Sequence, residues 1–304
     1  MRKMRPILTI VLMIFNITVF GQSLFFNEEK MIDFRVPRSS ESYESRIVRI
    51  DSQDTLVRKV NYPIKFRWNP INKNEIVGCD VWTCGKWNLI TNQYDTLFSS
   101  SESFILELSA NETFCFILTT TNEMERFDNY NLYKIDLKTK KIEEIKLKEH
   151  YGIINLYASN KYLAFVDYQY DEKTDNVSTQ LIIYNIENEQ LTIVDKAFLD
   201  QDEWLGRIDD YSVMNWENDN ELYYFKQESG KSKGTILKYD VNSKTITKEF
   251  EFPYERMHSF ALKEDGIIIE KDGKLLFVDK QNNEKIIYQV GYKFDFILDQ
   301  FYFR

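Results

Sequence analysis

Aromatic and basic side chains in long polar loops are the residues of this chain that could form a ligand-binding site. The loops join segments with strand-like composition, and long loops on a rigid scaffold are where functional residues usually lie. The alternative is that these are solvated acidic loops in which a few aromatic side chains only fill space. The ligand-binding candidates are Trp82, Trp87, Arg126, Tyr168, Tyr170, Trp204 and Arg207.

No catalytic motif is recognisable, so we predict no catalytic residues. The sequence lacks the Gly-x-Ser-x-Gly elbow of serine hydrolases, the Gly-x-Gly-x-x-Gly fingerprint and the P-loop. His150 and His258 are the only histidines, and each is expected to be a turn or packing residue. Two carboxylates that face each other could cleave a glycosidic bond, but spacing singles out no pair among the 48 acidic residues.

The sequence also gives no pattern for a metal or a cofactor. Asp167, Asp171 and Asp175 are four residues apart and do not match the Asp-x-Asp-x-Asp-Gly arrangement of a calcium loop. The three Cys and two His stand at spacings that match no zinc-binding pattern. We therefore predict that the protein uses neither a metal nor a cofactor.

The spacing of the cysteines allows one disulfide. Cys79 and Cys84 are close in sequence and could be joined across a turn if strand geometry brings their β-carbons within about 4 Å. A loop that short would stabilise the fold only modestly. Cys115 lies in the apolar run 114–117, and we expect it to be a buried apolar residue rather than a reactive thiol.

The first residues have the features of a secretory signal peptide. Residues 1–21 combine a basic start, an apolar stretch of about 14 residues and a small residue, Gly21, at a plausible cleavage site. The stretch is shorter than the roughly 20 residues of a membrane span, although an uncleaved anchor is the alternative. No later segment is apolar enough to span a membrane. We expect an exported protein, either periplasmic or secreted.

Composition and charge exclude several classes of protein. The chain is 43% hydrophobic and 29% charged, with only 10 Gly and 5 Pro, which indicates a globular protein. Aromatic residues make up 15% of the chain and favour strands. The formal net charge of −9 becomes −12 when residues 1–21 are removed. An acidic surface argues against nucleic acid as a partner.

A hairpin pattern recurs along the chain. Each copy has an apolar run, an Asp or Asn, a short polar turn and a second strand, as at 132–142, 181–191 and 236–246. Asp or Asn suits the turn because its side chain can bond the turn backbone and because it tolerates positive φ. Another pair of strand-like segments precedes each copy. The turn positions 51, 91, 136, 185, 240 and 279 are 39–55 residues apart, the length of one four-stranded unit.

This repeat resembles that of β-propellers, specifically the TolB-like six-bladed kind. In that family a blade often begins with a Trp-Ser-Pro-Asp-Gly-like turn, and Trp-Asn-Pro at 68–70 and Trp-Glu-Asn-Asp at 216–219 are weaker versions of it. The resemblance implies an all-β fold, a six-bladed β-propeller of four-stranded antiparallel blades. The propeller would occupy residues 45–304 as a single domain, after a lead segment at 22–44.

The two ends of the chain are predicted to share one blade. Residues 46–60 form only the last hairpin of a unit, and residues 294–303 have the pattern of the missing first hairpin. Their pairing would close the ring and remove two exposed sheet edges. Five blades in all is the alternative if one unit has been divided wrongly. The continuous blades are expected at 63–98, 102–148, 151–195, 210–251 and 257–290.

Ligand binding is the function that this organisation favours. Propellers bind ligands where the loops of several blades converge at one mouth of the central channel. Expected export, a complete ring and the lack of a recognisable catalytic motif therefore favour a non-catalytic, exported propeller that binds a protein, peptide or glycan at its loop-rich mouth. Two alternatives stay open, an envelope assembly or scaffold component and a carbohydrate-active enzyme that uses channel carboxylates.

Overall fold

The structure is a computed structural model in which strands and turns make up the described part of the chain. No helix occurs within that part, and so none is long and apolar enough to cross a membrane. The predicted signal peptide, Arg126 and both histidines lie outside the described residues. The structure describes residues 23–31, 43–51, 55–59, 67–121, 130–147, 152–171, 173, 176–198, 203–205, 207–208, 211–212, 214–227, 234–251, 260–263, 265–271, 274–289 and 296–303.

The fold is a six-bladed β-propeller, as predicted, with four antiparallel strands in most blades. The chain forms two compact units. Unit 1 comprises residues 1–61, 258–261 and 265–304, and unit 2 comprises residues 62–257 and 262–264.

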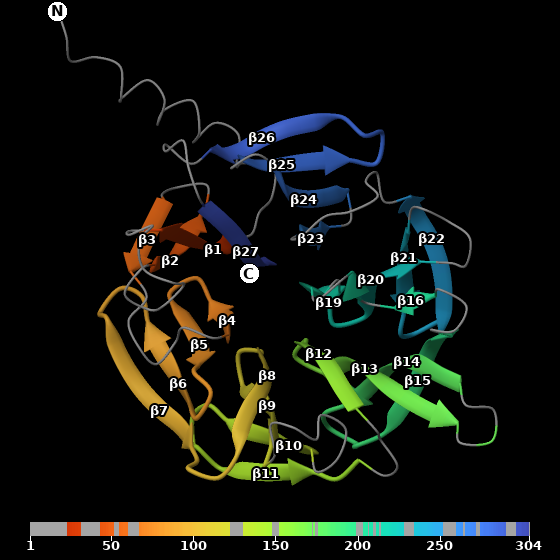
Figure 1. Cartoon of the computed structure of the whole chain (residues 1–304), viewed down its shortest axis with the longest axis horizontal. Coiled ribbons are helices and arrows are strands. Elements are labelled where there is room, and N and C mark those ends of the chain that lie inside the picture. The colour runs from red at the N-terminus through yellow and green to blue at the C-terminus, as the bar shows by residue number, and fades with distance from the viewer. Residues whose placement is uncertain are drawn as a thin grey trace, which may run out of the picture. The chain divides into compact units, whose positions relative to one another are not determined.

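Unit 2 contains four sheets whose strands run in chain order from the inner to the outer edge (Figure 1). The first sheet has β4 (Arg67–Asn72), β5 (Glu75–Cys79), β6 (Thr83–Asn88) and β7 (Gln93–Ser99). The second has β8 (Phe104–Ala110), β9 (Phe114–Thr120), β10 (Tyr130–Asp136) and β11 (Ile142–Ile145). The third has β12 (Gly152–Ala158), β13 (Tyr162–Asp171), β14 (Asn176–Asn185) and β15 (Leu191–Phe198). The fourth has β19 (Met214–Asn218), β20 (Glu221–Gln227), β21 (Thr235–Asp240) and β22 (Thr245–Glu251).

A short insertion precedes the fourth sheet. Its first strand, β16 (Trp204–Leu205), pairs with the end of β20, while β19 pairs with the beginning of β20. The next two strands, β17 (Arg207–Ile208) and β18 (Tyr211–Ser212), form a small hairpin of their own. The insertion therefore adds backbone beside the inner strand at one end of this sheet.

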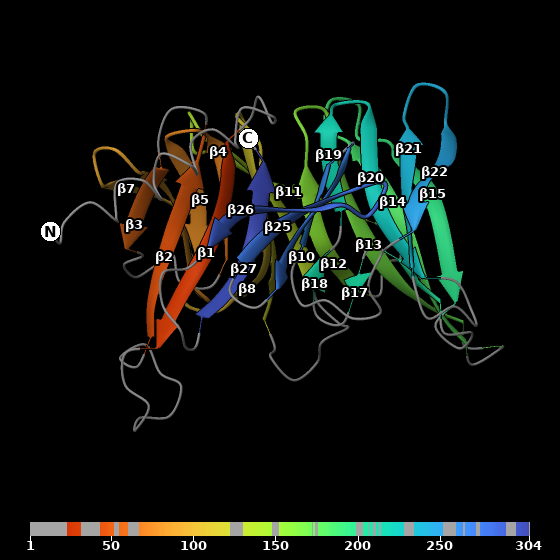
Figure 2. The same cartoon turned by 90° about the horizontal axis from the view of Figure 1, so that it is seen from above.

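The two ends of the sheets in unit 2 differ in how the chain connects them. At one end, here called the crossover end, the chain passes from the outer strand of one sheet to the inner strand of the next. The opposite end, the hairpin end, carries only tight turns. Figure 2 shows the β17–β18 hairpin on one side of unit 2 and the β21–β22 turn on the other. Loops that could carry function are thus concentrated at the crossover end.

Apolar side chains fill the space between neighbouring sheets of unit 2. In β9, Cys115 and Ile117 belong to the core shared with the β4–β7 sheet, whereas Phe116 and Leu118 belong to the core shared with the β12–β15 sheet. Successive residues of a strand point to opposite faces. A middle strand packed on both faces must therefore be apolar at nearly every position, which explains its uninterrupted apolar run.

Polar side chains join adjacent sheets at the hairpin end. The Asn111 side-chain amide donates to the Ser159 carbonyl oxygen at 2.6 Å, and the Trp216 indole donates to the Tyr157 carbonyl oxygen at 2.9 Å. The Trp216 ring also stacks on Tyr162 with centroids 5.7 Å apart. The tryptophan that the sequence pattern singled out is therefore a link between two sheets.

The repeated turn between third and fourth strands depends on an Asp or Asn side chain, as predicted. Asp136 Oδ1 accepts from the backbone N–H groups of Lys138 at 2.9 Å and Thr139 at 2.6 Å. In the first sheet of unit 2 the prediction was wrong in position, because Asn88, rather than residue 91, accepts from the turn backbone. Equivalent bonds occur at Asn185, Asp240 and Asp279.

Positive φ in these turns is not confined to Asn. Asn92 and Asn282 adopt it, but Lys140, Glu189 and Lys244 do so as well, with φ of 59°, 60° and 55°. The sequence argument linked positive φ to Asn and Asp, and it missed these three residues. The side-chain cap and the hairpin register fix the backbone conformation of the turn. A residue type that disfavours positive φ is therefore tolerated there, and it lowers the free energy of unfolding by about 1 kcal/mol.

Unit 1 contains the sheet shared by the two chain ends, with the order β27-β1-β2-β3. The C-terminus contributes a single strand instead of the expected hairpin, and β1 comes from the segment that we expected to be only a lead. This segment forms strand β1 because the burial of Leu24, Phe25 and Phe26 stabilises it in the sheet. The strands are β1 (Leu24–Met31), β2 (Tyr43–Ile50), β3 (Thr55–Lys59) and β27 (Phe296–Phe303).

The second sheet of unit 1, order β23-β24-β25-β26, packs against the shared sheet. Phe26 lies edge-on to Tyr288, with ring centroids 5.0 Å apart. The strands are β23 (Phe260–Lys263), β24 (Gly266–Lys271), β25 (Lys274–Asp279) and β26 (Glu284–Gln289), of which residues 262–264 belong to unit 2.

Replacing Lys244 by Gly should raise the stability, because Gly adopts φ of 55° without the steric penalty of a β-carbon. We expect the free energy of unfolding to rise by about 0.5–1 kcal/mol, measured by urea denaturation. Asn242→Gly is the control, since it lies in the same turn without positive φ and should not stabilise. A destabilised Lys244→Gly variant would contradict the explanation.

Replacing Gly85 by Ala should destabilise the β4–β7 sheet. A β-carbon at Gly85 would overlap the ring and hydroxyl of Tyr94 on β7, which lies across the glycine. Overpacking of this kind costs about 1–3 kcal/mol. In a Tyr94→Ala background the same substitution should cost less, with the close contact to the Asp95 carbonyl oxygen remaining, and equal costs in both backgrounds would show that the ring is not the obstacle.

Candidate functional site

Three aromatic side chains are exposed in the described part of the chain, and all lie at the crossover end of unit 2. Trp82 is 36% exposed in the β5–β6 turn, Tyr170 is 44% exposed near the end of β13, and Phe198 is 36% exposed at the end of β15. The exposed aliphatic side chains of unit 2 lie in its hairpin half, and they are Ile90, Ile142, Leu191, Ile193 and Ile246. The two ends of unit 2 thus have different surface chemistry.

The position of Trp82 is fixed by its turn and by the next sheet. Asp80 Oδ1 accepts from the backbone N–H groups of Trp82 at 2.7 Å and Thr83 at 2.6 Å. The Trp82 carbonyl oxygen accepts from Ser100 at 3.0 Å, and its ring lies against Phe104 with centroids 4.2 Å apart. One face of the indole is therefore packed while part of the ring stays available to a ligand.

Phe198 is held by Glu203, whose carboxylate accepts from the Phe198 backbone N–H at 3.1 Å and whose own backbone N–H donates to the Phe198 carbonyl oxygen at 3.2 Å. A polar network precedes Phe198 on β15. Asp195 accepts from the Tyr224 hydroxyl at 2.8 Å and forms an ion pair with Lys226, whose ammonium also donates to the Lys196 carbonyl oxygen at 3.1 Å. Burial, followed by the charge and hydrogen bond of Asp195, raises the pKa of Tyr224, so this phenol stays a hydrogen-bond donor. The Lys196 ammonium lies 5.1 Å from the Phe198 ring centroid.

A buried carboxylate lies beneath the exposed part of β13. Asp167 is fully buried, accepts from the Gly152 backbone N–H at 3.4 Å and also accepts from the Gln169 side-chain amide. Tyr168 is half-buried and Tyr170 is exposed on the same strand. The strand therefore presents alternating residues to a polar interior and to the surface of the crossover end.

The other candidates separate into two groups. Trp204 and Arg207 lie on β16 and β17, and so their backbone is at the crossover end, but their side chains and Arg126 lie outside the described residues. Trp87 is not part of the group. It is 3% exposed near the hairpin end, and its indole donates to Asn92 Oδ1 at 3.0 Å, which makes it a turn-stabilising residue.

Sequence reasoning did not select Phe198, Phe104 or Lys196 as site residues. A lone Phe at the end of a strand looks the same whether it faces a neighbouring sheet or solvent. Only the bulge at Val194, which shifts the register of β15, places Ile193, Lys196 and Phe198 on one face. The sequence offers no local signal for such a bulge.

At the inner edge of unit 2, the carboxylate of Glu107 belongs to a salt bridge between two sheets. Arg67 on β4 contacts Glu107 on β8 at 3.1 Å and donates to the Leu106 carbonyl oxygen at 2.9 Å. Glu107 therefore links the β8–β11 sheet to the β4–β7 sheet. Within the described ranges, no cluster of three His, Cys, Asp or Glu residues is arranged to hold a metal ion.

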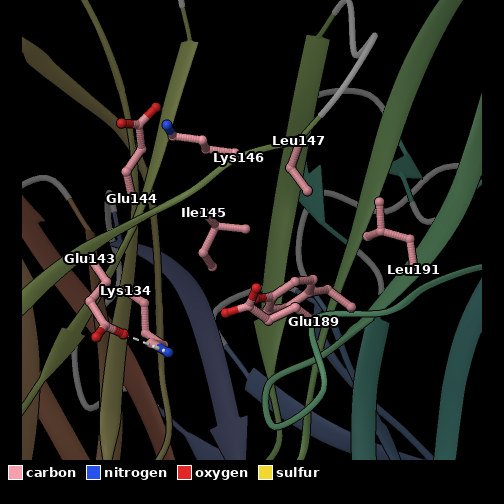
Figure 3. A pocket seen from close by; sticks show the side chains of 9 residues that line it. Lys134, Glu143, Glu144, Ile145, Lys146, Leu147, Glu189 and Leu191 are labelled. Atoms are coloured by element: carbon pink, nitrogen blue, oxygen red, sulfur yellow. Dashed lines mark ion pairs between the residues drawn. The ribbon is translucent and has the colours of Figure 1, made fainter.

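A cavity of about 370 Å³ opens at the outer side of unit 2, between β11 and the β14–β15 turn (Figure 3). Glu143 bridges Lys134 at 2.8 Å and Lys141 at 2.6 Å. Burial and then the nearby Glu189 raise the pKa of Tyr184, which keeps its hydroxyl protonated. The lining residues are Lys134, Glu143, Glu144, Ile145, Lys146, Leu147, Tyr184, Glu189 and Leu191.

No disulfide joins Cys79 and Cys84, so the pairing left open by the sequence is absent. The two residues are direct cross-strand neighbours on β5 and β6, but both are free, buried thiols. Cys115 is also buried, as predicted. The Cys84 side chain is oriented between sheets instead of along its own sheet, and its sulfur lies 3.8 Å from that of Cys115.

Comparison with known proteins identifies the fold but no family. No protein-family model matches the chain, and no curated protein sequence matches it. Solved structures are similar at low identity. An oligogalacturonate lyase in complex with manganese is 13% identical with a TM-score of 0.58, over 81% of this chain and 73% of that chain.

Two further similar structures are described in words that name no lyase activity. A chain of a nidogen–laminin complex is 8% identical with a TM-score of 0.54, covering 87% of this chain and 92% of that chain. The β-propeller domain of the trilobed protease from Pyrococcus furiosus is 13% identical with a TM-score of 0.50, covering 90% and 94%. These likenesses establish the propeller fold, which serves both enzymes and non-catalytic domains.

Glu143 should make the stability depend on pH on the acid side. Hydrogen bonds from Lys134 and Lys141, followed by their charges, lower the pKa of this carboxyl from 4.5 to about 2. Its contribution is complete above pH 4.5 and is lost as the pH falls toward 2. Glu143→Gln should therefore melt below wild type at pH 7, and this difference should shrink between pH 4.5 and 2.

The neighbouring Glu144 supplies the control, because no ion pair of this residue occurs in the described part of the chain. Glu144→Gln should leave the acid-side melting profile close to that of wild type. A Glu143→Gln deficit that persists unchanged at pH 2 would show that the ion pairs are not its source.

Proposed function

We propose that this protein is an exported, non-catalytic propeller that binds a protein, peptide or glycan ligand at the crossover end of unit 2. The observation that carries the proposal is that Trp82, Tyr170 and Phe198 all lie at that end, while no other aromatic side chain in the described residues is exposed. Aromatic side chains offer large contact areas, and such residues dominate the energetics of binding surfaces.

The way in which these side chains are held supports binding. Trp82 is positioned by Asp80 and Phe104, and the backbone of Phe198 by Glu203. Rings that are already ordered lose little conformational entropy when a ligand docks. Lys196 adds a cation beside the Phe198 ring, which suits a ligand with carbonyl, hydroxyl or carboxylate groups.

Export and TolB-like kinship form part of the same proposal. They are supported by the basic and apolar pattern of residues 1–21 and by the Trp-containing turns at 68–70 and 216–219. The similar structures include enzymes, but at 13% identity or less they share only the fold. The proposal of a non-catalytic role is supported by the absence of a nucleophile motif and by the commitment of Glu107 to Arg67.

The test is a thermal-shift screen followed by a matched pair of variants. Soluble glycans, cell-wall fragments and peptides are screened first, because a ligand at 100 times its Kd stabilises by about 2.7 kcal/mol and raises Tm by roughly 5–10 °C. The variant Trp82→Ala/Tyr170→Ala/Phe198→Ala should lose at least about 30-fold in affinity for any ligand found.

The control is Ile90→Ala/Ile142→Ala/Ile246→Ala, which removes exposed side chains only from the hairpin half. This variant should bind like wild type. Equal affinity of the aromatic triple variant and wild type would contradict the proposed site. Turnover of a screened glycan would contradict the non-catalytic role, and it would direct attention to carboxylates of the inner edge.

A further inference from the structure

All three thiols of the chain meet at one interface between two sheets. Cys79 on β5 and Cys84 on β6 belong to the β4–β7 sheet, and Cys115 on β9 belongs to the β8–β11 sheet. All three are buried in the same apolar cluster, with no exposed surface. The function proposed above does not use them.

The closest thiol contact crosses from one sheet to the other. The Cys84 and Cys115 sulfur atoms are 3.8 Å apart, whereas no such sulfur contact joins Cys79 to Cys84 in the described structure, although they are cross-strand partners. A disulfide needs its sulfur atoms about 2.05 Å apart and its β-carbons about 3.5–4.5 Å apart. Formation of the bond therefore requires a movement that brings the two sulfur atoms together from 3.8 Å.

We propose that Cys84 and Cys115 form a disulfide between the β4–β7 and β8–β11 sheets when the chain folds in an oxidising compartment, and that Cys79 remains a free thiol. The proposal draws on the expected export of the chain, because disulfides form and persist outside the cytosol. The pair spans 31 positions of sequence. The bond would therefore constrain the unfolded chain substantially more than a Cys79–Cys84 link would.

The reaction consumes one disulfide of an oxidant such as oxidised glutathione. The thiolate of one cysteine attacks an oxidant sulfur and releases the first glutathione thiolate, which leaves a mixed disulfide. The thiolate of the other cysteine attacks the protein sulfur of that mixed disulfide and releases the second glutathione. Two protons from the cysteines end on the two released thiols, so the protein is oxidised by two electrons.

The interior position indicates when the bond forms. The hydrogen bond with Cys115 and burial raise the pKa of the Cys84 thiol, and a protonated thiol is a poor nucleophile. Exchange in the finished fold is consequently slow. The bond should form while the two sheets dock, when both thiols are still accessible, and afterwards it should resist reduction unless the protein is unfolded.

The bond lies directly beneath the candidate binding end. Cys84 follows Trp82 by two residues, and the Trp82 ring rests on Phe104 of the neighbouring sheet. A covalent link between the same two sheets would hold this aromatic pair in one arrangement. The inference concerns the thiols alone, and it stands or falls without any knowledge of the ligand.

The experiment refolds the full chain with reduced and oxidised glutathione, blocks free thiols with iodoacetamide under denaturing conditions, and digests it with trypsin. Cys79 and Cys84 share the tryptic peptide 74–86, and Cys115 lies in peptide 87–126. We expect these two peptides to be linked, with one alkylated cysteine per chain. Cleavage before Asp80 should then place the alkylated cysteine, Cys79, outside the linked fragment.

The oxidised protein should melt roughly 5–15 °C above the protein refolded under reducing conditions. Cys79→Ser should keep both the linked peptides and this difference, whereas Cys84→Ser should lose both. Three alkylated cysteines, or a link confined to peptide 74–86, would overturn the proposal. The wild-type comparison needs no substitution, so the result stands even if a Cys84 variant fails to fold.

Discussion

The burial of both faces of the β8–β11 and β12–β15 sheets is the constraint on which the rest of unit 2 depends. A sheet with one wet face can alternate apolar and polar residues, but a sheet packed between two others cannot. Phe116 and Leu118 face one neighbour while Cys115 and Ile117 face the other. Exposed polar side chains are consequently concentrated at strand ends, in turns and on the outer strands, and the exposed aromatic residues Trp82, Tyr170 and Phe198 lie at strand ends or in a turn.

Two kinds of hydrogen bond satisfy backbone polar groups that this packing leaves without strand partners at the strand ends. Asp and Asn side chains cap the tight turns, and interior amides such as that of Asn111 join one sheet to the next. The result is a rigid hairpin end and a crossover end with longer connections. Rigidity at one end and variable loops at the other is a common basis for ligand binding on repeat scaffolds.

The architecture could be predicted from sequence because it depends on local sequence patterns. Apolar runs followed by Asp136, Asn185 or Asp240 identified the hairpins, and their spacing identified the blades. The errors arose where the decisive information is nonlocal. Strand β1 depends on pairing with β27 at the other end of the chain, and Cys84 turns toward Cys115 rather than Cys79. Trp87 and Trp82 have the same residue type, yet only the fold shows that one is buried and one exposed.

The pairing of β1 with β27 also governs the order of events in biosynthesis. Leu24 pairs with Phe303, so the first sheet to begin is the last that can be completed. Until residues 296–303 have been synthesised and reach β1, one edge of that strand has no partner and is open to pairing with other chains. Protection of this edge, by a chaperone or by delayed release of the chain, would raise the yield of folded protein. It would have little effect on the final stability.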